Sequence, residues 1–270
     1  MSEQHEVTRV YRIRPLTNLG EQHLSNRTID ALKKANDQLE EYRFLPWPVR
    51  GKRLYNQLKN KHVISVLRHP LHVHFSAINT HSPIRGRTQE EISDFSNIEN
   101  LFNNTLSTLE YSDICNFLCE ANKSIGGDGM IRDIPMGLTP DRYGRITLFA
   151  DVTELEEALK NLWCFIDSYQ DKGANLFCAL VSIVGLLNCH PFCDGNGRVA
   201  RVLLNVLLKR SLENYIPFYD FYHCTPGGYL LRLRQAQILG EWDELVMFHC
   251  NIINILANNE FYTSDGSEVP

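Results

Sequence analysis

Apolar positions along this chain of 270 residues recur mostly at every third or fourth residue, which is the spacing of amphipathic helices. The stretch over 175–189 is the most apolar, which predicts a helix in the centre of the core. The pattern predicts a mainly α protein, with helices over 28–44, 54–67, 71–84, 89–109, 112–121, 152–169, 175–189, 196–212, 227–239 and 242–257.

Local signals predict where several helices begin and end. Ser25 or Asn26 is suited to cap the first helix. Thr88 has the side chain of an N-cap, and Glu91 three residues later completes the pattern of a capping box. Pro191 disfavours helical geometry at His190, so the most apolar helix is predicted to end there.

A short stretch in the middle of the chain breaks the helical pattern. Two segments of strand character, Met130–Met136 and Ile146–Ala150, flank a turn-forming stretch over 137–144. Pro135 cannot donate to a ladder, so the first strand is predicted to lie at an edge or to kink. The two segments predict a lone β-hairpin that packs on helices or serves as a docking edge.

One polar, glycine-rich stretch lies between the apolar runs over 176–187 and 202–208. Its sequence is His190-Pro-Phe-Cys-Asp-Gly-Asn-Gly-Arg-Val-Ala-Arg201. Gly195 and Gly197 leave backbone N–H groups unshielded where a helix begins, which is typical of an anion site. Arg198 and Arg201 share one helix face and suit further phosphoryl oxygens of the same ligand.

The same stretch carries a metal ligand and a base. Asp194 is a hard oxygen donor beside the anion site, which suits Mg²⁺ bound to phosphates. His190 titrates near neutral pH and is able to accept a proton from a hydroxyl. Alone, each residue has an ordinary explanation as a helix terminator, a turn or a solvated face. Together they predict attack by a hydroxyl on a nucleotide phosphate.

Composition narrows the class of protein. The hydrophobic fraction of 43% and the charged fraction of 22% are those of an ordinary soluble protein. A net charge of -5 argues against a nucleic-acid partner bound through bulk phosphate neutralisation. The start of the chain lacks a secretory signal, and the longest apolar run is shorter than the roughly 20 residues of a membrane span. We expect a cytoplasmic protein without a membrane partner, with export as an effector and homodimer formation both left open.

Eight cysteines are present, without a CxxC pair, and several lie in apolar helical patterns. They are interpreted as reduced core thiols. A zinc-stabilised binding module is the alternative that the Cys and His residues raise, and their spacing matches no usual pair of ligand knuckles.

The stretch from His190 to Arg201 resembles the signature of the Fic family, HPFx[D/E]GNGRxxR, with every specified position filled. Residues 131–137 resemble the family's flap hairpin, and Trp242 resembles the closing element of its core. The resemblance covers about 110–255 and implies a Fic fold, a helical bundle with a small β-hairpin flap next to the active-site loop. We expect an N-terminal helical region over 1–109, the Fic domain over 110–257 and a frayed tail over 258–270.

The resemblance implies protein adenylyltransfer, in which AMP passes from ATP to a Ser, Thr or Tyr hydroxyl of a target protein and pyrophosphate is released. It implies that His190 is the base and that Asp194 holds Mg²⁺. The target's backbone would pair with the edge of the flap over 130–150. The nucleotide-binding residues that it implies are Gly195, Asn196, Gly197, Arg198, Arg201, Gly137, Leu138 and, near the adenine, Tyr229.

Many Fic proteins carry an inhibitory helix, [S/T]xxxE[G/N], whose glutamate pairs with the second motif arginine. The segment over 78–86, within a region 71–86, resembles an N-terminal version of that helix. His81 stands in the position of the Ser or Thr, and Arg85 in the position of the glutamate. Because an arginine cannot pair with Arg201, the chain is predicted to lack intrinsic inhibition by a glutamate.

Other activities remain as alternatives. Removal of AMP is associated in the family with the inhibitory glutamate, so its expected absence argues against that activity. Phosphotransfer goes with Ala-Asn-Lys, whereas this chain has Gly195-Asn196-Gly197. Another nucleotide donor, such as CDP-choline or UTP, stays open, as does a catalytically silent scaffold.

Overall fold

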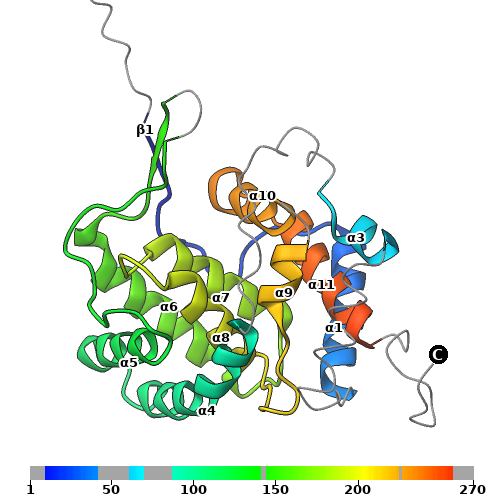
Figure 1. Cartoon of the computed structure of the whole chain (residues 1–270), viewed down its shortest axis with the longest axis horizontal. Coiled ribbons are helices and arrows are strands. Elements are labelled where there is room, and N and C mark those ends of the chain that lie inside the picture. Colours follow the sequence, from blue (N-terminus) through cyan, green and yellow to red (C-terminus); the bar gives the residue numbers. More distant parts are fainter. Residues whose placement is uncertain (1–9, 42–60, 70–86, 141–143, 225–226, 258–270) are drawn as a thin grey trace, which may run out of the picture.

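A computed structural model of the chain describes residues 10–41, 61–69, 87–140, 144–224 and 227–257, which form a bundle of helices with a small sheet projecting from it (Figure 1). The predicted mainly α fold is confirmed. The elements are β1 (Val10–Arg12), α1 (Asn26–Glu41), α3 (Lys61–Leu67), α4 (Arg87–Leu106), α5 (Tyr111–Ser124), β2 (Ile146–Leu148), α6 (Leu155–Gln170), α7 (Leu176–Cys189), α8 (Asn196–Leu207), α9 (Phe218–Cys224), α10 (Gly228–Arg234) and α11 (Asp243–Ala257).

Helix α7 lies at the centre of the bundle and packs against α6 and α8. Every residue from Ala179 to Cys189 is buried, so this helix has no polar face turned to solvent. Helix α8 is nearly as buried, from Val199 to Leu207 with the exception of Arg201. The predicted central position of the most apolar helix is confirmed, and burial of both helices holds the loop between them in place.

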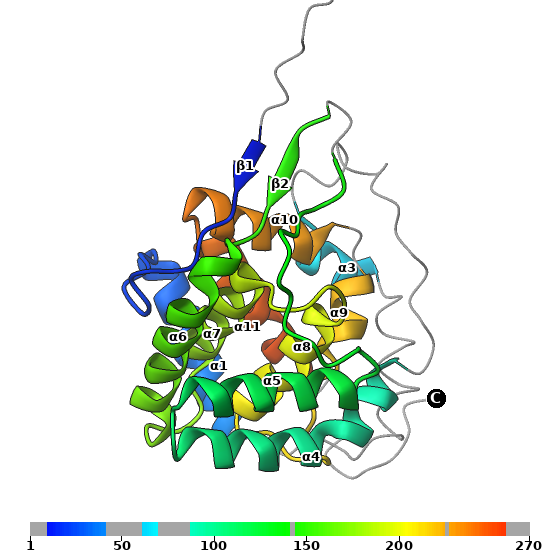
Figure 2. The same cartoon turned by 90° about the vertical axis from the view of Figure 1, so that its left-hand side faces the viewer.

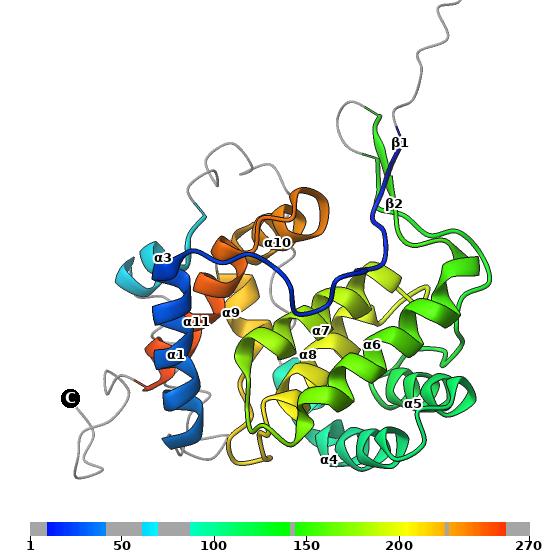
Figure 3. The same ribbon diagram turned by 180° about the vertical axis from the view of Figure 1, so that it is seen from behind.

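Two outer layers cover this pair on opposite sides (Figures 1 and 3). Helices α4 and α5 pack on each other and on α8, and α1 packs along α11. The start of α1 is tied to the start of α11, because Asp243 Oδ1 accepts hydrogen bonds from Ser25 N (2.9 Å) and Ser25 Oγ (2.8 Å). The N-terminal elements therefore pack directly on the core.

Two predicted features of α4 are wrong. The helix begins at Arg87, so Thr88 lies inside it instead of capping it, and Thr88 Oγ1 donates to Asp220 Oδ2 at 2.8 Å. Glu91 does not complete a capping box, because its carboxylate lies in the core beside Arg201. Helix α9 was not predicted, and the helix predicted over 71–84 lies outside the described residues.

The sheet differs from the predicted hairpin. Strand β2 pairs in parallel with β1, from Val10 opposite Ile146 to Arg12 opposite Leu148 (Figure 2). The stretch over 130–136 forms no strand, but the end of this arm pairs antiparallel with β2 through a bridge from Gly137 to Leu148. Two backbone hydrogen bonds flank the bridge, from Leu138 N to Thr147 O at 2.8 Å and from Phe149 N to Met136 O at 2.9 Å. A three-residue strand such as β1 is too short for alternation to reveal it.

All eight cysteines are free thiols. Cys189 and Cys250 are buried as predicted, whereas Cys164 and Cys193 are exposed, so the core interpretation is wrong for these two. Within the described residues, no helix combines the length and apolar character needed to cross a membrane.

Shortening a side chain in α8 tests the central helix pair. Leu203 is fully buried, so Leu203→Ala leaves a cavity and is expected to lower the free energy of unfolding by about 2–5 kcal/mol in urea denaturation. Leu212→Ala is the control, because Leu212 is 45% exposed and its loss is expected to change stability by less than about 0.5 kcal/mol. Equal effects of the two substitutions would contradict the central position of α8.

Candidate active site

The loop between α7 and α8 lines one pocket of about 230 Å³. All the candidate residues predicted in this loop meet there, together with Cys193. The lining residues are His190, Cys193, Asp194, Gly195, Asn196, Gly197, Arg198 and Arg201. Gly137, Leu138 and Tyr229, which the family resemblance adds to the nucleotide site, do not line this pocket.

His190 caps α7 in the left-handed conformation, with φ 48° and ψ 60°. Its N–H still donates to Leu186 O at 2.9 Å, and the chain then turns away through Pro191. The predicted end of the helix at His190 is confirmed. The imidazole lies flat on the ring of Phe149, with centroids 3.7 Å apart and planes within 5°. The turn and the stacked ring together fix where the imidazole points.

The environment keeps the imidazole neutral. Burial, helped by the positive charges of Arg132 and Arg234, lowers the pKa of His190 to about 4, against the opposing influence of the Leu187 backbone. The expectation that His190 titrates near neutral pH is therefore wrong, because the imidazole is already unprotonated there and able to accept a proton. Its Nδ1 is a buried atom, which leaves Nε2 as the ring nitrogen for a ligand in the pocket.

Gly195 makes the turn into α8. It caps the helix with φ 89°, a conformation that favours glycine, and an added Cβ would lie 2.5 Å from Asn122 Nδ2. Asn122 is fully buried and donates from Nδ2 to Asp194 O at 3.0 Å, while its Oδ1 accepts from Gly129 N at 2.9 Å. It thus ties α5 to the loop. No motif marked Asn122, although an Asn on the apolar face of a predicted helix is a signal of a buried polar contact.

Asn196 shapes the loop with its side chain. Its Oδ1 accepts from Phe192 N at 3.0 Å, and its Nδ2 donates to Phe192 O at 2.7 Å. With both amide groups engaged, the side chain has little left to offer a phosphate. The backbone N–H groups at the start of α8, those of Asn196 and Gly197, are the donors suited to an anion, because the first turn of a helix lacks carbonyl partners.

Asp194 is the exposed carboxylate of the loop, with its side chain 87% exposed. Its Oδ1 accepts from Gly195 N at 2.6 Å, and its Oδ2 pairs with Arg198 Nη2 at 3.0 Å. A single accessible carboxylate beside an anion site fits Mg²⁺, which usually binds one or two carboxylates together with substrate phosphates. Among the described residues, no group of three or more His, Cys, Asp or Glu side chains is placed to hold a metal by itself.

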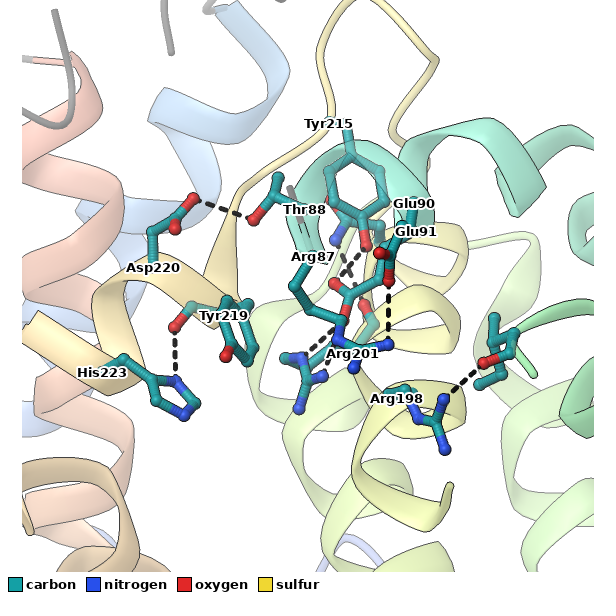
Figure 4. A network of polar contacts seen from close by, with 12 residues as sticks. Arg87, Thr88, Glu90, Glu91, Arg198, Arg201, Tyr215, Tyr219, Asp220 and His223 are labelled. Atoms are coloured by element: carbon teal, nitrogen blue, oxygen red, sulfur yellow. Dashed lines mark hydrogen bonds and ion pairs between the residues drawn. The ribbon is translucent and has the colours of Figure 1, made fainter. Parts of the chain in front are cut away.

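The two motif arginines have different partners. Arg198 donates from Nη1 to Ile125 O at 2.6 Å, besides its pair with Asp194. Arg201 donates from Nε and Nη2 to Glu91 Oε1, at 2.9 and 2.6 Å, and its guanidinium lies 5.0 Å from the ring centre of Tyr219 (Figure 4). Both arginines line the pocket, but Arg198 pairs with the exposed carboxylate of Asp194, whereas Arg201 pairs with a buried carboxylate.

Glu91 is buried, 1% exposed, and its Oε2 accepts from Tyr215 OH at 3.2 Å. Burial disfavours the charge of Arg201, but the carboxylate beside it outweighs this effect and raises the pKa of Arg201. Arg201 therefore has a glutamate partner, which the prediction of a chain without intrinsic inhibition by a glutamate did not anticipate. Arg85, the residue proposed for that position, lies outside the described residues.

A sequence signal for Glu91 was present. Buried positions of α4 include Thr88, Glu91, Ile92 and Phe95, so Glu91 shares the helix face of apolar residues. A carboxylate on such a face needs a buried cation, since an unpaired charge in the core is too costly. The capping-box pattern hid this signal, because it offered Glu91 a local role.

Tyr229 lies close enough to Arg201 and Arg234 to feel their charges, but it does not line the pocket. Its ring stacks on Tyr222, with centroids 3.7 Å apart and planes within 3°. Burial raises the pKa of Tyr229 to about 12, although Arg201 and Arg234 act in the opposite direction. Its predicted place near an adenine stays a prediction.

The bundle of helices has the same fold as solved structures of Fic proteins. Residues 106–208, a span that contains the whole loop, match the sequence profile of the Fic/DOC family. A Fic family protein from Desulfovibrio desulfuricans has a similar structure, with a TM-score of 0.55 and 13% identity over 92% of this chain and 76% of that one. Fic-1 from C. elegans superposes with a TM-score of 0.51 and 17% identity, over 87% and 72%. These identities show a shared fold alone, and no curated protein matches the chain.

Adding a methyl group at Gly195 tests the loop geometry. Gly195→Ala would force an alanine to a positive φ, at about 1–2 kcal/mol, and would also push Asn122 away. Gly144→Ala is the matched control, since Gly144 has φ 72° but open space around it. Urea denaturation should show a clearly larger loss for Gly195→Ala. Equal losses would mean that the contact with Asn122 does not hold the loop.

Proposed function

We propose that the chain is a protein adenylyltransferase, which transfers AMP from ATP to a Ser, Thr or Tyr hydroxyl of a target protein. The observation that carries the proposal is the shared pocket of His190 and the start of α8. There a neutral base lies beside backbone N–H groups and arginines suited to phosphates. The Fic/DOC match is consistent with transfer of a nucleotide-derived group.

Residues at the two ends of the loop have different roles in the proposed reaction. The target oxygen forms a bond to the α-phosphorus of ATP while the bond from that phosphorus to the bridging oxygen breaks and pyrophosphate leaves. His190 Nε2 takes the hydroxyl proton. The N–H groups of Asn196 and Gly197 stabilise charge on the phosphate, and Arg198 and Arg201 hold the outer phosphates. Mg²⁺ held by Asp194 would neutralise phosphate charge when bound.

Glu91 is proposed to restrain this activity. Two nitrogens of the Arg201 guanidinium donate to Glu91, so the arginine must leave that carboxylate, or share it, to bind a phosphate. The bonds are short and buried, which makes them strong. Low basal turnover is expected, as in family members with an inhibitory glutamate.

The target is proposed to dock along the arm over 130–138. Strand β1 already pairs with one edge of β2, so this arm carries the opposite edge of the small sheet. Its side chains Met130 and Ile134 are 66% and 52% exposed. An extended target segment would add to the backbone of this arm, and the exposed apolar side chains would contribute specificity.

Removal of AMP is a second candidate, and one observation favours it. That activity is associated in the family with the inhibitory glutamate, and Glu91 lies beside Arg201 in this chain. Because Glu91 occupies this position, a missing glutamate no longer speaks against AMP removal.

Labelled ATP tests the proposed transfer. With [α-³²P]ATP and Mg²⁺ we expect label on the protein or on an added target, whereas [γ-³²P]ATP should leave none. His190→Ala should abolish the α-label, since general-base catalysis contributes about 10²–10⁴-fold. Mass spectrometry should find a mass increase of one AMP on a hydroxyl side chain. Label from the γ-phosphate would point to phosphotransfer instead.

Neutralising Glu91 tests the restraint. Glu91→Gln keeps the shape of the side chain but weakens its charge-assisted bonds to Arg201, so α-label transfer should rise by at least about tenfold. Glu90→Gln is the matched control, because Glu90 is the neighbouring residue and pairs with Arg87 at the surface. It should leave transfer unchanged.

The same pair of variants separates the two candidate activities. If the chain removes AMP with the help of Glu91, Glu91→Gln should lose hydrolysis of an adenylylated protein. Any rise in its α-label would then be no larger than this lost hydrolysis accounts for. A Glu91→Gln variant that is no more active than Glu90→Gln in either assay would contradict the regulatory role of Glu91.

A further inference from the structure

Arg132 is a buried arginine, 3% exposed, in the arm over 130–138, which is called the flap arm below. Its guanidinium donates to four backbone carbonyls. Nε donates to His190 O at 2.6 Å, and Nη2 donates to Cys189 O at 3.0 Å and Ala150 O at 2.6 Å. Nη1 donates to Ile134 O at 2.9 Å within the same arm. The backbone N–H of Arg132 adds a bond to Pro191 O at 2.8 Å.

These bonds join three segments that the active site needs. Cys189 and His190 form the end of α7, Ala150 follows β2, and Ile134 belongs to the flap arm. The last carbonyls of a helix lack partners within it, and a cation there is favoured by the helix dipole. Burial nevertheless lowers the pKa of Arg132, so a charge kept in this position is held against a desolvation penalty.

The acceptors of Arg132 include the two backbone segments that carry the stacked rings. One is His190 itself, and the other is Ala150, the residue directly after Phe149. A single guanidinium therefore sets the spacing between the backbones of His190 and Phe149, whose rings lie 3.7 Å apart. It also holds the carbonyl of His190, a residue in the uncommon left-handed conformation that needs support from its surroundings.

We propose that Arg132 is a positioning residue for the base, which holds His190 on Phe149 and ties its orientation to the flap arm where the target would dock. This inference rests on the proposed function for its consequence in catalysis. The position of His190 itself is a structural matter that is measurable without turnover. A target pressing on the arm over 130–138 would act on the same guanidinium that orients the base.

Arg210 provides a matched control. It is also buried, and its guanidinium also donates to backbone carbonyls only, Leu208 O and Leu39 O, both at 2.8 Å. It lies after α8 and does not line the candidate active site. Replacing it removes a buried guanidinium of the same type while the end of α7 stays intact.

The experiment compares Arg132→Gln, Arg132→Lys and Arg210→Gln in the full chain, with His190 observed by ¹H–¹⁵N NMR over a pH titration. The charged groups that act on His190 are Arg132 and Arg234. Arg132→Gln removes one of them and frees the ring, so the pKa of His190 should rise from about 4 toward its ordinary value. Arg210→Gln should leave that pKa unchanged while lowering stability to a similar extent.

Kinetics complete the test. Arg132→Gln should lower kcat for α-label transfer by about 10–100-fold, the effect expected when a catalytic group moves by about 1 Å. The KM for ATP should stay within about threefold, since the anion site belongs to α8. Arg132→Lys keeps the charge but loses the forked geometry of the guanidinium. It should therefore lower kcat while changing the pKa of His190 less than Arg132→Gln does. If Arg132→Gln does not fold, Arg132→Lys provides the test.

The outcomes separate the two proposals. Wild-type protein without α-label transfer, combined with a shifted His190 pKa in Arg132→Gln, would reject the proposed function and support the positioning role. Transfer by the wild type, combined with Arg132 variants that match Arg210→Gln in His190 pKa and kcat, would overturn the positioning role and keep the proposed function.

Discussion

The packing of α7 against α8 is the constraint on which the rest of the structure depends. The two helices are joined by a short loop, so the carbonyl end of one lies beside the N–H end of the other. The first end carries His190 and attracts the cation Arg132, and the second end favours anions. Because both helices are buried almost throughout, core packing sets the distance between the base and the anion site.

Buried charged side chains determine many of the contacts around α7 and α8. Arg201 faces inward from α8 and is matched by Glu91 of α4, whereas Arg132 is matched by carbonyl dipoles. An ion pair and a ring of carbonyls are two ways to keep a guanidinium in the interior. Their consequences differ, because a carboxylate competes with a phosphate for Arg201, whereas backbone carbonyls hold Arg132 in one place. The same physical need thus produces a contact that a ligand would have to break and a contact that should persist.

Local pattern was sufficient for the helices and for the loop. The run of apolar residues before His190 predicted the central helix, and Pro191 predicted its end. The glycines predicted the turn into α8, where Gly195 has the positive φ that such a turn needs. Contacts between distant segments were missed or misread. Glu91 was assigned to a capping box, β1 was too short to recognise, and neither Asn122 nor Arg132 belongs to a pattern that shows its partners.

The sequence by itself determined the mainly α fold, the central helix and the meeting of His190, Asp194 and Arg198 around one pocket, because periodicity and turn chemistry act over a few residues. Only the tertiary structure decided which residue faces Arg201, what holds His190 in place, and which edge of β2 is occupied. Glu91 and Arg201 are 110 positions apart, and Arg132 and His190 are 58 apart. Pairings at such distances follow from which surfaces the packed helices bring together, and no local pattern records them.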